Sequence, residues 1–444
     1  MRRLGFVLVL LLGLAALASS TFSAAAPPRT AGLVPATGAG TDGGSPFDPL
    51  PAGIALKDAY TPLTVTVENP STLPFPGTDG RYHVAYNLLL QNASVVPATL
   101  RKLEVVDAFH PNRVIVSFAG TQLVDPACPF GDCNRLRALP AVPVKSAVIP
   151  PEQARLVFVD FSFGSLDEAP AYVLHHLFIE GATSPVVTKP KASDYTVTPY
   201  RISVRGPITI GPPLKGRNWV ALNGCCEPGF AHRSSPVAVN GNLVAGQLFA
   251  IDWKRTNDQG AFYTGDKTKN ESYVDYGSPI LAVADGTVTE TLDTMDANTP
   301  GVLPAKDPVL ARKLTLQTVD GNHIVLRLGR GVYAFYAHLL KGSLKVKVGD
   351  RVHRGQVIAS LGNTGNANAS HLHFQLMNGP SVLGSSGIPY VIDHFQYQGQ
   401  VSPQQIADAD NYLTGSFFGP GHLAEPEARQ DQLPLAWAIV NFPD

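Results

Sequence analysis

Short runs in which apolar and polar residues alternate recur through the first half of the chain. An alternation with a period of two places one set of side chains in a core and the other in solvent, which is typical of a half-buried β-strand. Turn signals at Pro76-Gly77 and Asp79-Gly80 separate the first two runs. The runs lie at residues 63–67, 82–90, 100–106, 114–118 and 154–161. Short strands over this length predict a β-sandwich of immunoglobulin-like type at residues 52–185.

The second half of the chain repeats the pattern. Its predicted strands lie at residues 249–253, 280–284, 286–289, 314–318, 323–328, 332–340, 357–361 and 371–377. Helical periodicity longer than two turns occurs only near residues 404–413. We therefore expect an all-β fold, in which an antiparallel β-sheet domain at residues 214–400 follows the sandwich. A C-terminal extension at residues 401–444 ends in a predicted strand at 433–442.

The ends and connections have a different composition. Residues 1–26 combine Arg2 and Arg3, an apolar run at 4–17 and small residues before Pro27, which predicts a secretory signal peptide. The apolar run is short for a bilayer span of about 20 residues. Residues 27–51 predict a disordered linker, and residues 186–213 predict a linker between the domains. We expect an exported protein, secreted or in the periplasm or cell envelope, with no membrane span once the signal peptide is removed.

Charge and cysteine content narrow the possible functions. The chain has 444 residues, a formal net charge of −1 and 16% charged residues, so no basic surplus favours nucleic acid or an anionic membrane surface. Four cysteines fit an oxidising compartment. Cys128 and Cys133 predict a small disulfide-closed loop, while Cys225 and Cys226 either bond to each other or stay reduced. A zinc site made of thiolates is disfavoured by the spacing, and the pairing cannot be read from sequence.

Histidines and one aspartate fall on the polar faces of predicted strands in the second domain. In the strand at 371–377, His371 and His373 share one face and three apolar residues occupy the other. Asp252 lies opposite the apolar side chains of its own strand, and a carboxylate there faces a cleft without burying a charge in the core. His338 shares one face of its strand with Ala334 and Tyr336, and we expect it to sit over the same cleft. His232 is the only histidine between residues 176 and 323, so no other imidazole can precede Asp252 in this domain.

Four linked motifs resemble the core of the lysostaphin and LytM-type zinc endopeptidases, which cut the peptide cross-links or stems of peptidoglycan. The motifs are Tyr336-Ala337-His338-Leu339, Val348-Gly349-Asp350-Arg351-Val352-His353-Arg354-Gly355-Gln356, Gly362-Asn363-Thr364-Gly365 and His371-Leu372-His373-Phe374. The similarity spans residues 231–377. It implies that the sheet domain is a metallopeptidase domain and that His232, Asp252 and His373 bind one zinc ion. It also implies that His371 and His338 serve the reaction.

The sequence departs from the compact form of this family between the first two ligands. There the first histidine and the aspartate lie four positions apart, whereas nineteen residues separate His232 from Asp252 here. We interpret this as an inserted loop or hairpin. Residues 257–276 are a further addition that could line a substrate groove, in which Asp258, Asp266 and Asp275 are expected to be solvated loop acids rather than ligands.

The resemblance predicts an exported zinc endopeptidase, a monomer that acts on peptidoglycan peptides. No His-Glu-x-x-His helix occurs, so imidazole must move the protons. We assign His371 as general base and His338 as the group that stabilises the oxyanion, with the two roles open to exchange. The alternative is a catalytically silent peptidoglycan-binding or regulatory protein of the same fold. A third interpretation is an adhesive two-domain β-protein with incidental histidines and no stoichiometric zinc.

Overall fold

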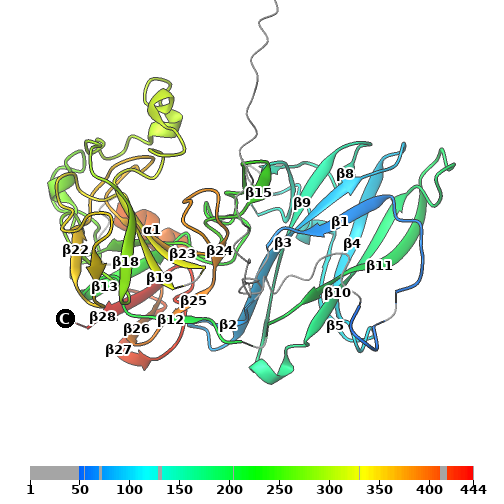
Figure 1. The fold of residues 1–444 in the computed structure, drawn as a ribbon, viewed down its shortest axis with the longest axis horizontal. Helices are drawn as coiled ribbons and strands as arrows, with labels where there is room; N and C mark the ends of the chain where they lie inside the picture. The colour runs from blue at the N-terminus through cyan, green and yellow to red at the C-terminus, as the bar shows by residue number, and fades with distance from the viewer. Residues whose placement is uncertain are drawn as a thin grey trace, which may run out of the picture. The chain divides into compact units, whose positions relative to one another are not determined.

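A computed structural model describes residues 50–54, 56–69, 73–128, 133–203, 205–329, 331–410 and 418–443 of the chain. All described residues belong to one compact unit, residues 41–444, and the names first domain and second domain keep the predicted division, which stays a prediction. The predicted signal peptide and almost all of the predicted linker at 27–51 lie outside the described residues. The described part is nearly all β, with a single α-helix, α1 (Pro403–Asp410), so the predicted fold class is confirmed (Figure 1).

The first domain contains two antiparallel sheets. One runs in the order β1-β3-β9-β6-β7, with β2 beside β3, and the other runs β11-β10-β4-β5, with β8 beside β4. The strands of the first sheet are β1 (Leu63–Val67), β2 (Phe75–Pro76), β3 (Tyr82–Asn92), β6 (Leu136–Ala138), β7 (Val142–Pro143) and β9 (Ala154–Phe163). The strands of the second are β4 (Ala98–Asp107), β5 (Val114–Ala119), β8 (Val148–Ile149), β10 (Tyr172–Gly181) and β11 (Lys191–Arg201).

Both sheets of the first domain contribute to one hydrophobic cluster. Val84 and Val157 from the first sheet and Leu103 and Leu177 from the second are fully buried in it. Sharing a core in this way is how two half-apolar sheets remove their inner faces from water. The immunoglobulin-like class of this domain stays a prediction. Residues 191–201, expected within the connection, form β11 and pair with β10.

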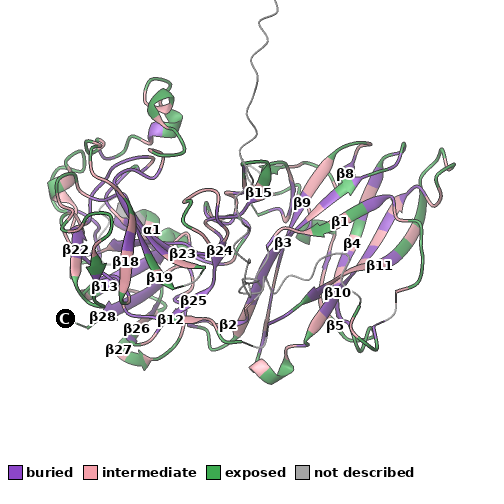
Figure 2. Cartoon of the chain, viewed as in Figure 1, coloured by how far each residue is buried: buried purple, intermediate pink, exposed green. Residues whose placement is uncertain are grey.

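An eleven-stranded sheet forms the second domain, in the order β21-β18-β19-β20-β23-β16-β13-β28-β26-β27 with β24 beside β23. Its strands are β13 (Gly216–Leu222), β16 (Ile251–Arg255), β18 (Gly286–Leu292), β19 (His323–Gly329), β20 (Val332–Ala337), β21 (Arg351–Val352), β23 (Leu372–Met377), β24 (Gly387–Ile388), β26 (Phe395–Gln400), β27 (His422–Arg429) and β28 (Ala438–Phe442). All of β23 is buried (Figure 2). Strands β27 and β28 come from the predicted C-terminal extension and so complete the sheet.

Three two-stranded sheets and five short 3-10 helices complete the described structure. The pairs are β12 (Ile208–Ile210) with β25 (Tyr390–Ile392), β14 (Val237–Val239) with β15 (Asn242–Val244), and β17 (Pro279–Leu281) with β22 (Val357–Ser360). The 3-10 helices are η1 (Gly120–Gln122), η3 (Leu166–Glu168), η4 (Asn270–Ser272), η5 (Pro304–Lys306) and η6 (Ala311–Lys313). None of the described helices is long and apolar enough to cross a membrane.

The predicted strand at residues 314–318 is wrong, because this segment forms turns after η6. The Thr318 hydroxyl accepts the Thr315 N–H at 2.9 Å, and the Thr315 hydroxyl accepts the Gln317 N–H at 3.2 Å. Such local side-chain bonds offer the backbone an alternative to a strand ladder. The alternation of apolar and polar residues was therefore misleading here.

The four cysteines form two disulfides. Cys128 bonds to Cys133 and Cys225 bonds to its neighbour Cys226. The predicted small loop is therefore closed, and the adjacent pair adopts the bonded alternative. The second bond lies in the segment that joins β13 to β14, which also carries His232.

Candidate metal centre

Two adjacent strands place a carboxylate and an imidazole side by side. In the antiparallel register of β16 and β23, Asp252 lies directly opposite His373. The His373 Nδ1 atom lies 3.0 Å from Asp252 Oδ1. Both residues are buried, and each is flanked along its strand by apolar residues that face the core. The alternation that predicted their common face is therefore what brings the two side chains together.

His232 reaches this pair from the loop between β13 and β14. Its Nε2 atom lies 3.3 Å from Asp252 Oδ1, and its ring centroid lies 4.7 Å from that of His373. One ligand atom from each of the three residues lies within 4.8 Å of the others. The structure thus assembles the three predicted metal ligands, including the one that the long insertion separates from Asp252.

The two remaining histidines border the same group. His371 precedes β23, and its Nε2 atom lies 3.5 Å from Asp252 Oδ1. His338 follows β20, and its ring centroid lies 4.6 Å from that of His371 and 5.9 Å from that of His373. His338 adopts a positive φ of 63°. A left-handed backbone at a histidine costs about 1–3 kcal/mol, and positions of this kind are typical of functional sites.

Carbonyl groups fix the tautomers of three of these imidazoles. The Nδ1–H groups of His232, His338 and His371 donate to the carbonyls of Ala250 at 3.0 Å, Thr364 at 2.7 Å and Ala369 at 2.9 Å respectively. A neutral imidazole that donates at Nδ1 carries its lone pair on Nε2. In His232, His338 and His371, the Nε2 atom therefore carries the lone pair.

His373 has the opposite tautomer. When its Nε2–H donates to Gln375 Oε1 at 2.9 Å, the neutral ring has its lone pair on Nδ1, and a proton added there is donated to Asp252 Oδ1 at 3.0 Å. The second oxygen of Asp252 is held by Asn223, whose Nδ2 donates to Oδ2 at 2.8 Å. Oδ1 is thus the oxygen that faces the three nearest imidazoles. Sequence reasoning missed Asn223, and it placed Gln375 on the correct face without giving it a role.

This donor set fits a zinc ion. Zinc takes imidazole nitrogen and carboxylate oxygen, and catalytic sites use three protein ligands so that a further position stays open. Two lone pairs and one carboxylate oxygen converge here from buried residues, and each ligand is oriented by an outer hydrogen bond to Ala250, Gln375 or Asn223. The histidines and aspartate that would hold the ion are His232, Asp252 and His373.

Electrostatics favour a charged carboxylate at the centre. Burial alone would raise the pKa of Asp252, but the neighbouring His232 and His371 outweigh it, and the pKa lies well below its usual range. Burial also works against protonation of His373, yet its bond to Asp252 raises the pKa of His373 above 6.5. In the metal-free protein a proton on His373 can therefore pair with Asp252, and a divalent cation would compete with that proton.

The pKa values of His338 and His371 are lowered, in contrast to that of His373. Burial lowers the pKa of His338 well below 6.5, and the adjacent His371 and His373 lower it further. Burial also lowers the pKa of His371, and the charge of Asp252 partly opposes the change. Both rings are therefore neutral at neutral pH, with an Nε2 lone pair able to accept a proton.

The glycine-rich motif at 362–365 holds the ring of His338 through a hydrogen bond. Thr364 accepts the His338 ring N–H through its carbonyl and accepts the Asn322 N–H through its hydroxyl at 2.9 Å. Gly365 has a φ of 73°, and a Cβ there would lie 2.1 Å from the backbone nitrogen of Gly321. Only glycine allows this close approach, which explains why the motif holds glycine at that position.

The expectation for the loop acids is wrong at one of three positions. The side chains of Asp258 and Asp266 are exposed, at 82% and 49%. Asp275 is fully buried, and one of its oxygens accepts the Arg255 N–H at 3.4 Å. Burial raises the pKa of Asp275 to about 7, with nearby Lys254 opposing the shift. Its segment packs into the domain through long-range contacts that local composition does not encode.

Comparisons with known proteins define the class of this domain. The sequence model described as Peptidase family M23 matches residues 271–383, a range that contains His338, His371 and His373. Glycyl-glycine endopeptidase ALE-1 of Staphylococcus capitis is 34% identical over 131 residues, which cover 28% of this chain and 30% of that protein. Peptidoglycan DD-endopeptidase ShyA of Vibrio cholerae serotype O1 is 42% identical over 57 residues, or 13% of each chain.

One solved structure is also similar in sequence to part of the chain. The catalytic domain of the antimicrobial peptidase lysostaphin from Staphylococcus simulans is 25% identical, covering 34% of this chain and 80% of that chain with a TM-score of 0.20. The chain spans less than a third of the length of the two curated relatives. The chain carries a peptidase M23 domain, and the predicted resemblance to the lysostaphin type is confirmed.

Proposed function

We propose that the protein is an exported zinc-dependent endopeptidase that hydrolyses peptide bonds in peptidoglycan cross-links or stems. The M23 domain and its peptidoglycan endopeptidase relatives support the reaction class and the substrate. The signal-like N-terminal sequence supports export. The observation that carries the proposal is the convergence of ligand atoms from His232, Asp252 and His373 within 4.8 Å, with two further imidazoles at its margin.

Zinc held by these ligands would supply a Lewis acid that polarises a peptide carbonyl and lowers the pKa of a bound water to about 7. The protein's own part is to orient the ligands and to move protons. Asn223 holds one oxygen of Asp252 so that the other faces the ligands. Gln375 holds the His373 ring so that Nδ1 faces inward.

His371 is the proposed general base. Its Nε2 atom is free because Nδ1 donates to Ala369, and the ring is neutral because burial lowers its pKa. Once Nε2 takes a proton from the attacking water, the charge of Asp252 at 3.5 Å stabilises the imidazolium. The same proton can then be passed to the leaving amine.

His338 is the proposed stabiliser of negative charge on the substrate carbonyl oxygen. Its Nδ1–H is committed to Thr364 and the neutral ring carries its lone pair on Nε2, so it would donate from Nε2 only after that nitrogen has taken a proton from solvent. Its ring lies 4.6 Å from that of His371, close enough for the two rings to serve one reacting group. Matched glutamine variants of the two histidines test the reverse assignment, with His338 as base.

Digestion of purified peptidoglycan by the mature protein tests this function. Peptidoglycan is incubated with the protein, with the protein plus a chelator, and with the chelated protein after zinc is restored. Released fragments are identified by mass and by their new amino termini. We expect new termini that disappear with chelator and return with zinc, and the fragment masses identify the bond that is cleaved.

Two variants control the experiment. His373→Ala removes a ligand and should give no new termini, whereas His353→Ala removes an exposed histidine, with its side chain 86% accessible, and should cleave normally. Peptidoglycan that binds the unaltered protein but stays intact would instead favour the silent binding protein. Absence of stoichiometric zinc in the unaltered protein would reject the metallopeptidase assignment.

A further inference from the structure

The insertion between two metal ligands contacts the first domain. Residues 233–251 separate His232 from Asp252 and form the β14–β15 hairpin. Leu243 of β15 packs against a small apolar cluster that the first domain supplies. That cluster contains Ala141, Leu156 and Phe158, and Leu89 also packs against it. The departure from the compact ligand spacing thus contacts the first domain, as do Leu433 and Leu435, whose N–H groups donate to Pro76 and Thr78.

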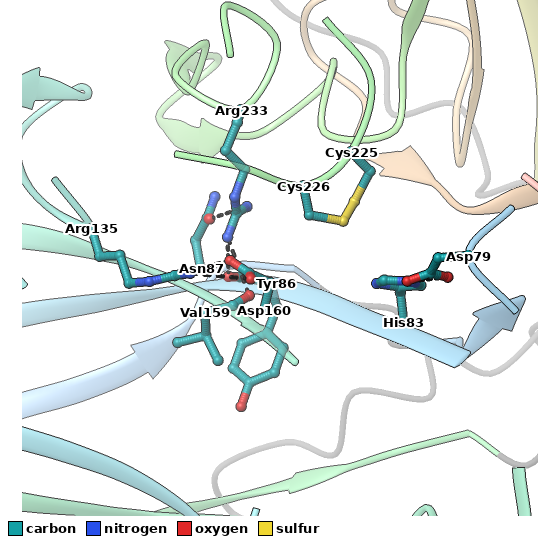
Figure 3. Close-up of a disulfide and its surroundings, with 10 residues drawn as sticks. All are labelled: Asp79, His83, Tyr86, Asn87, Arg135, Val159, Asp160, Cys225, Cys226 and Arg233. Atoms are coloured by element: carbon teal, nitrogen blue, oxygen red, sulfur yellow. Dashed lines mark hydrogen bonds and ion pairs between the residues drawn. A yellow bond between two sulfur atoms is a disulfide. The ribbon is translucent and has the colours of Figure 1, made fainter. Parts of the chain in front are cut away.

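Arg233, the residue after the ligand His232, is buried in the sheet of the first domain. It is only 2% exposed. Its Nη1 donates to Asn87 Oδ1 at 2.7 Å, and its Nη2 donates to the carbonyls of Tyr86 at 2.9 Å and Val159 at 3.2 Å (Figure 3). Tyr86 and Val159 are cross-strand partners in β3 and β9, so one guanidinium spans two strands.

The planar guanidinium suits this place. It lies over the ring of Phe158, with Cζ 4.6 Å from the ring centroid. Burial lowers the pKa of Arg233 to about 9, so the group still carries its charge at neutral pH. A buried charge is stable only where hydrogen-bond acceptors surround it, and here Asn87, Tyr86 and Val159 are those acceptors. The guanidinium therefore has a defined position rather than a range of rotamers.

A second buried arginine, Arg137, belongs to the first domain and donates to the turn that carries His232. Arg137 of β6 donates from Nη2 to the carbonyl of Pro228 at 3.0 Å, and that carbonyl also accepts the Ser234 hydroxyl at 2.8 Å. The turn at residues 228–234 is therefore bonded to the first domain on both sides of His232. The Cys225–Cys226 disulfide lies just before this turn (Figure 3).

The ring of His232 is oriented by a residue that lies just before β16, the strand that carries Asp252. His232 donates to Ala250 at 3.0 Å, which sets the ring orientation, while its backbone belongs to the turn held by Arg233 and Arg137. We propose that the first domain is a structural part of the metal centre, and that Arg233 is a positioning residue that holds His232 in ligand geometry. This inference rests on the proposed function, because it takes His232 to be a ligand.

Zinc affinity of the full mature chain tests the inference. The dissociation constant is measured at neutral pH by competition with a chromophoric chelator, for the unaltered protein and for Arg233→Met and Arg233→Lys. Methionine keeps the apolar stem over Phe158 and removes the donors, so we expect roughly 10- to 100-fold weaker binding, the range for lost outer-shell partners. Lysine keeps one charged donor and should recover part of that loss.

Two control variants separate positioning from general stability. Leu103→Ala opens a cavity in the core of the first domain and should lower the unfolding midpoint without weakening zinc binding. Arg155→Met removes an arginine that donates within its own domain, to Ala154 and Gln153, and should also bind zinc normally. Equal weakening in Leu103→Ala and Arg233→Met would overturn the inference, since stability alone would then explain the loss.

A double-mutant cycle keeps the inference testable if Arg233→Met folds poorly. Asn87→Ala removes one acceptor of the guanidinium and should weaken zinc binding several-fold. The same change in an Arg233→Lys background should have a smaller effect, because the two residues act through one contact. Additive effects, or unchanged zinc affinity in Arg233→Met, would overturn the inference. An unaltered protein that binds no zinc would instead overturn the proposed function.

Discussion

The strand-borne and loop-borne ligands of the candidate centre are held by different means. Asp252 and His373 face each other in a strand ladder, so their separation is set by backbone hydrogen bonds of the sheet itself. His232 lies in a turn that two arginines bond to another domain. A sheet positions its residues through local repetition, whereas a loop depends on whatever it packs against. Two of the three proposed ligands are therefore positioned by the sheet itself, and we infer that the third depends on the first domain.

Removal of a strand-borne ligand should have the largest effect. His373→Ala leaves two of the three proposed zinc ligands, Asp252 and His232. We therefore expect loss of stoichiometric zinc and of cleavage together. Zinc is measured by elemental analysis of the dialysed protein, and cleavage by the release of new amino termini. A variant that kept one zinc ion per chain and full activity would exclude His373 as a ligand.

The histidines outside the ligand set should affect the reaction but not the metal. His371→Gln cannot accept a proton, so we expect kcat to fall about 10²- to 10⁴-fold with one zinc ion still bound. His338→Gln keeps a neutral donor and should lose less. Steady-state kinetics and zinc content decide the question. If His338→Gln proves the more damaging variant, the roles of the two histidines must be exchanged.

Variants of the residues that hydrogen-bond to the strand-borne ligands can be compared directly with Arg233→Met, which affects the loop-borne ligand. Gln375→Leu frees the ring of His373, and Asn223→Ala frees one oxygen of Asp252. Each should weaken zinc binding about 10- to 100-fold. Chelator competition measures both on the same scale as Arg233→Met. Undiminished affinity in Gln375→Leu would mean that the strand ladder alone orients the ring.

Acid should weaken zinc binding by a smaller, graded amount. The bond to Asp252 raises the pKa of His373 above 6.5 in the metal-free protein, so the proton competes with zinc as the pH falls through that raised value. Below it, affinity should fall by about tenfold per pH unit for one displaced proton. Calorimetric titrations in buffers of different ionisation enthalpy count the protons released. An affinity that stayed constant between about pH 8 and pH 6 would contradict this coupling.

Alternation along single strands was enough to predict the sheet-borne part of the site. It placed His371, His373 and Asp252 on polar faces, and the structure brings these faces together because neighbouring strands share one pleat. For His338 the alternation was misleading, because it grouped His338 with Ala334 and Tyr336, which pack in the core. His338 follows the end of β20 with a φ of 63°, so it does not continue that face. The family resemblance supplied His232, which no periodicity could place.

The sequence by itself determined the all-β fold, the strands that border the cleft and the motifs of an M23 domain. Only the tertiary structure decided how His232 meets Asp252 across nineteen residues, that Asp275 is buried, and that Arg233 enters the first domain. Alternation is a local property with a period of two and can be read along the chain. Contacts between loops and a second domain join residues more than a hundred positions apart, as Arg233 and Asn87 do, and leave no periodic signal.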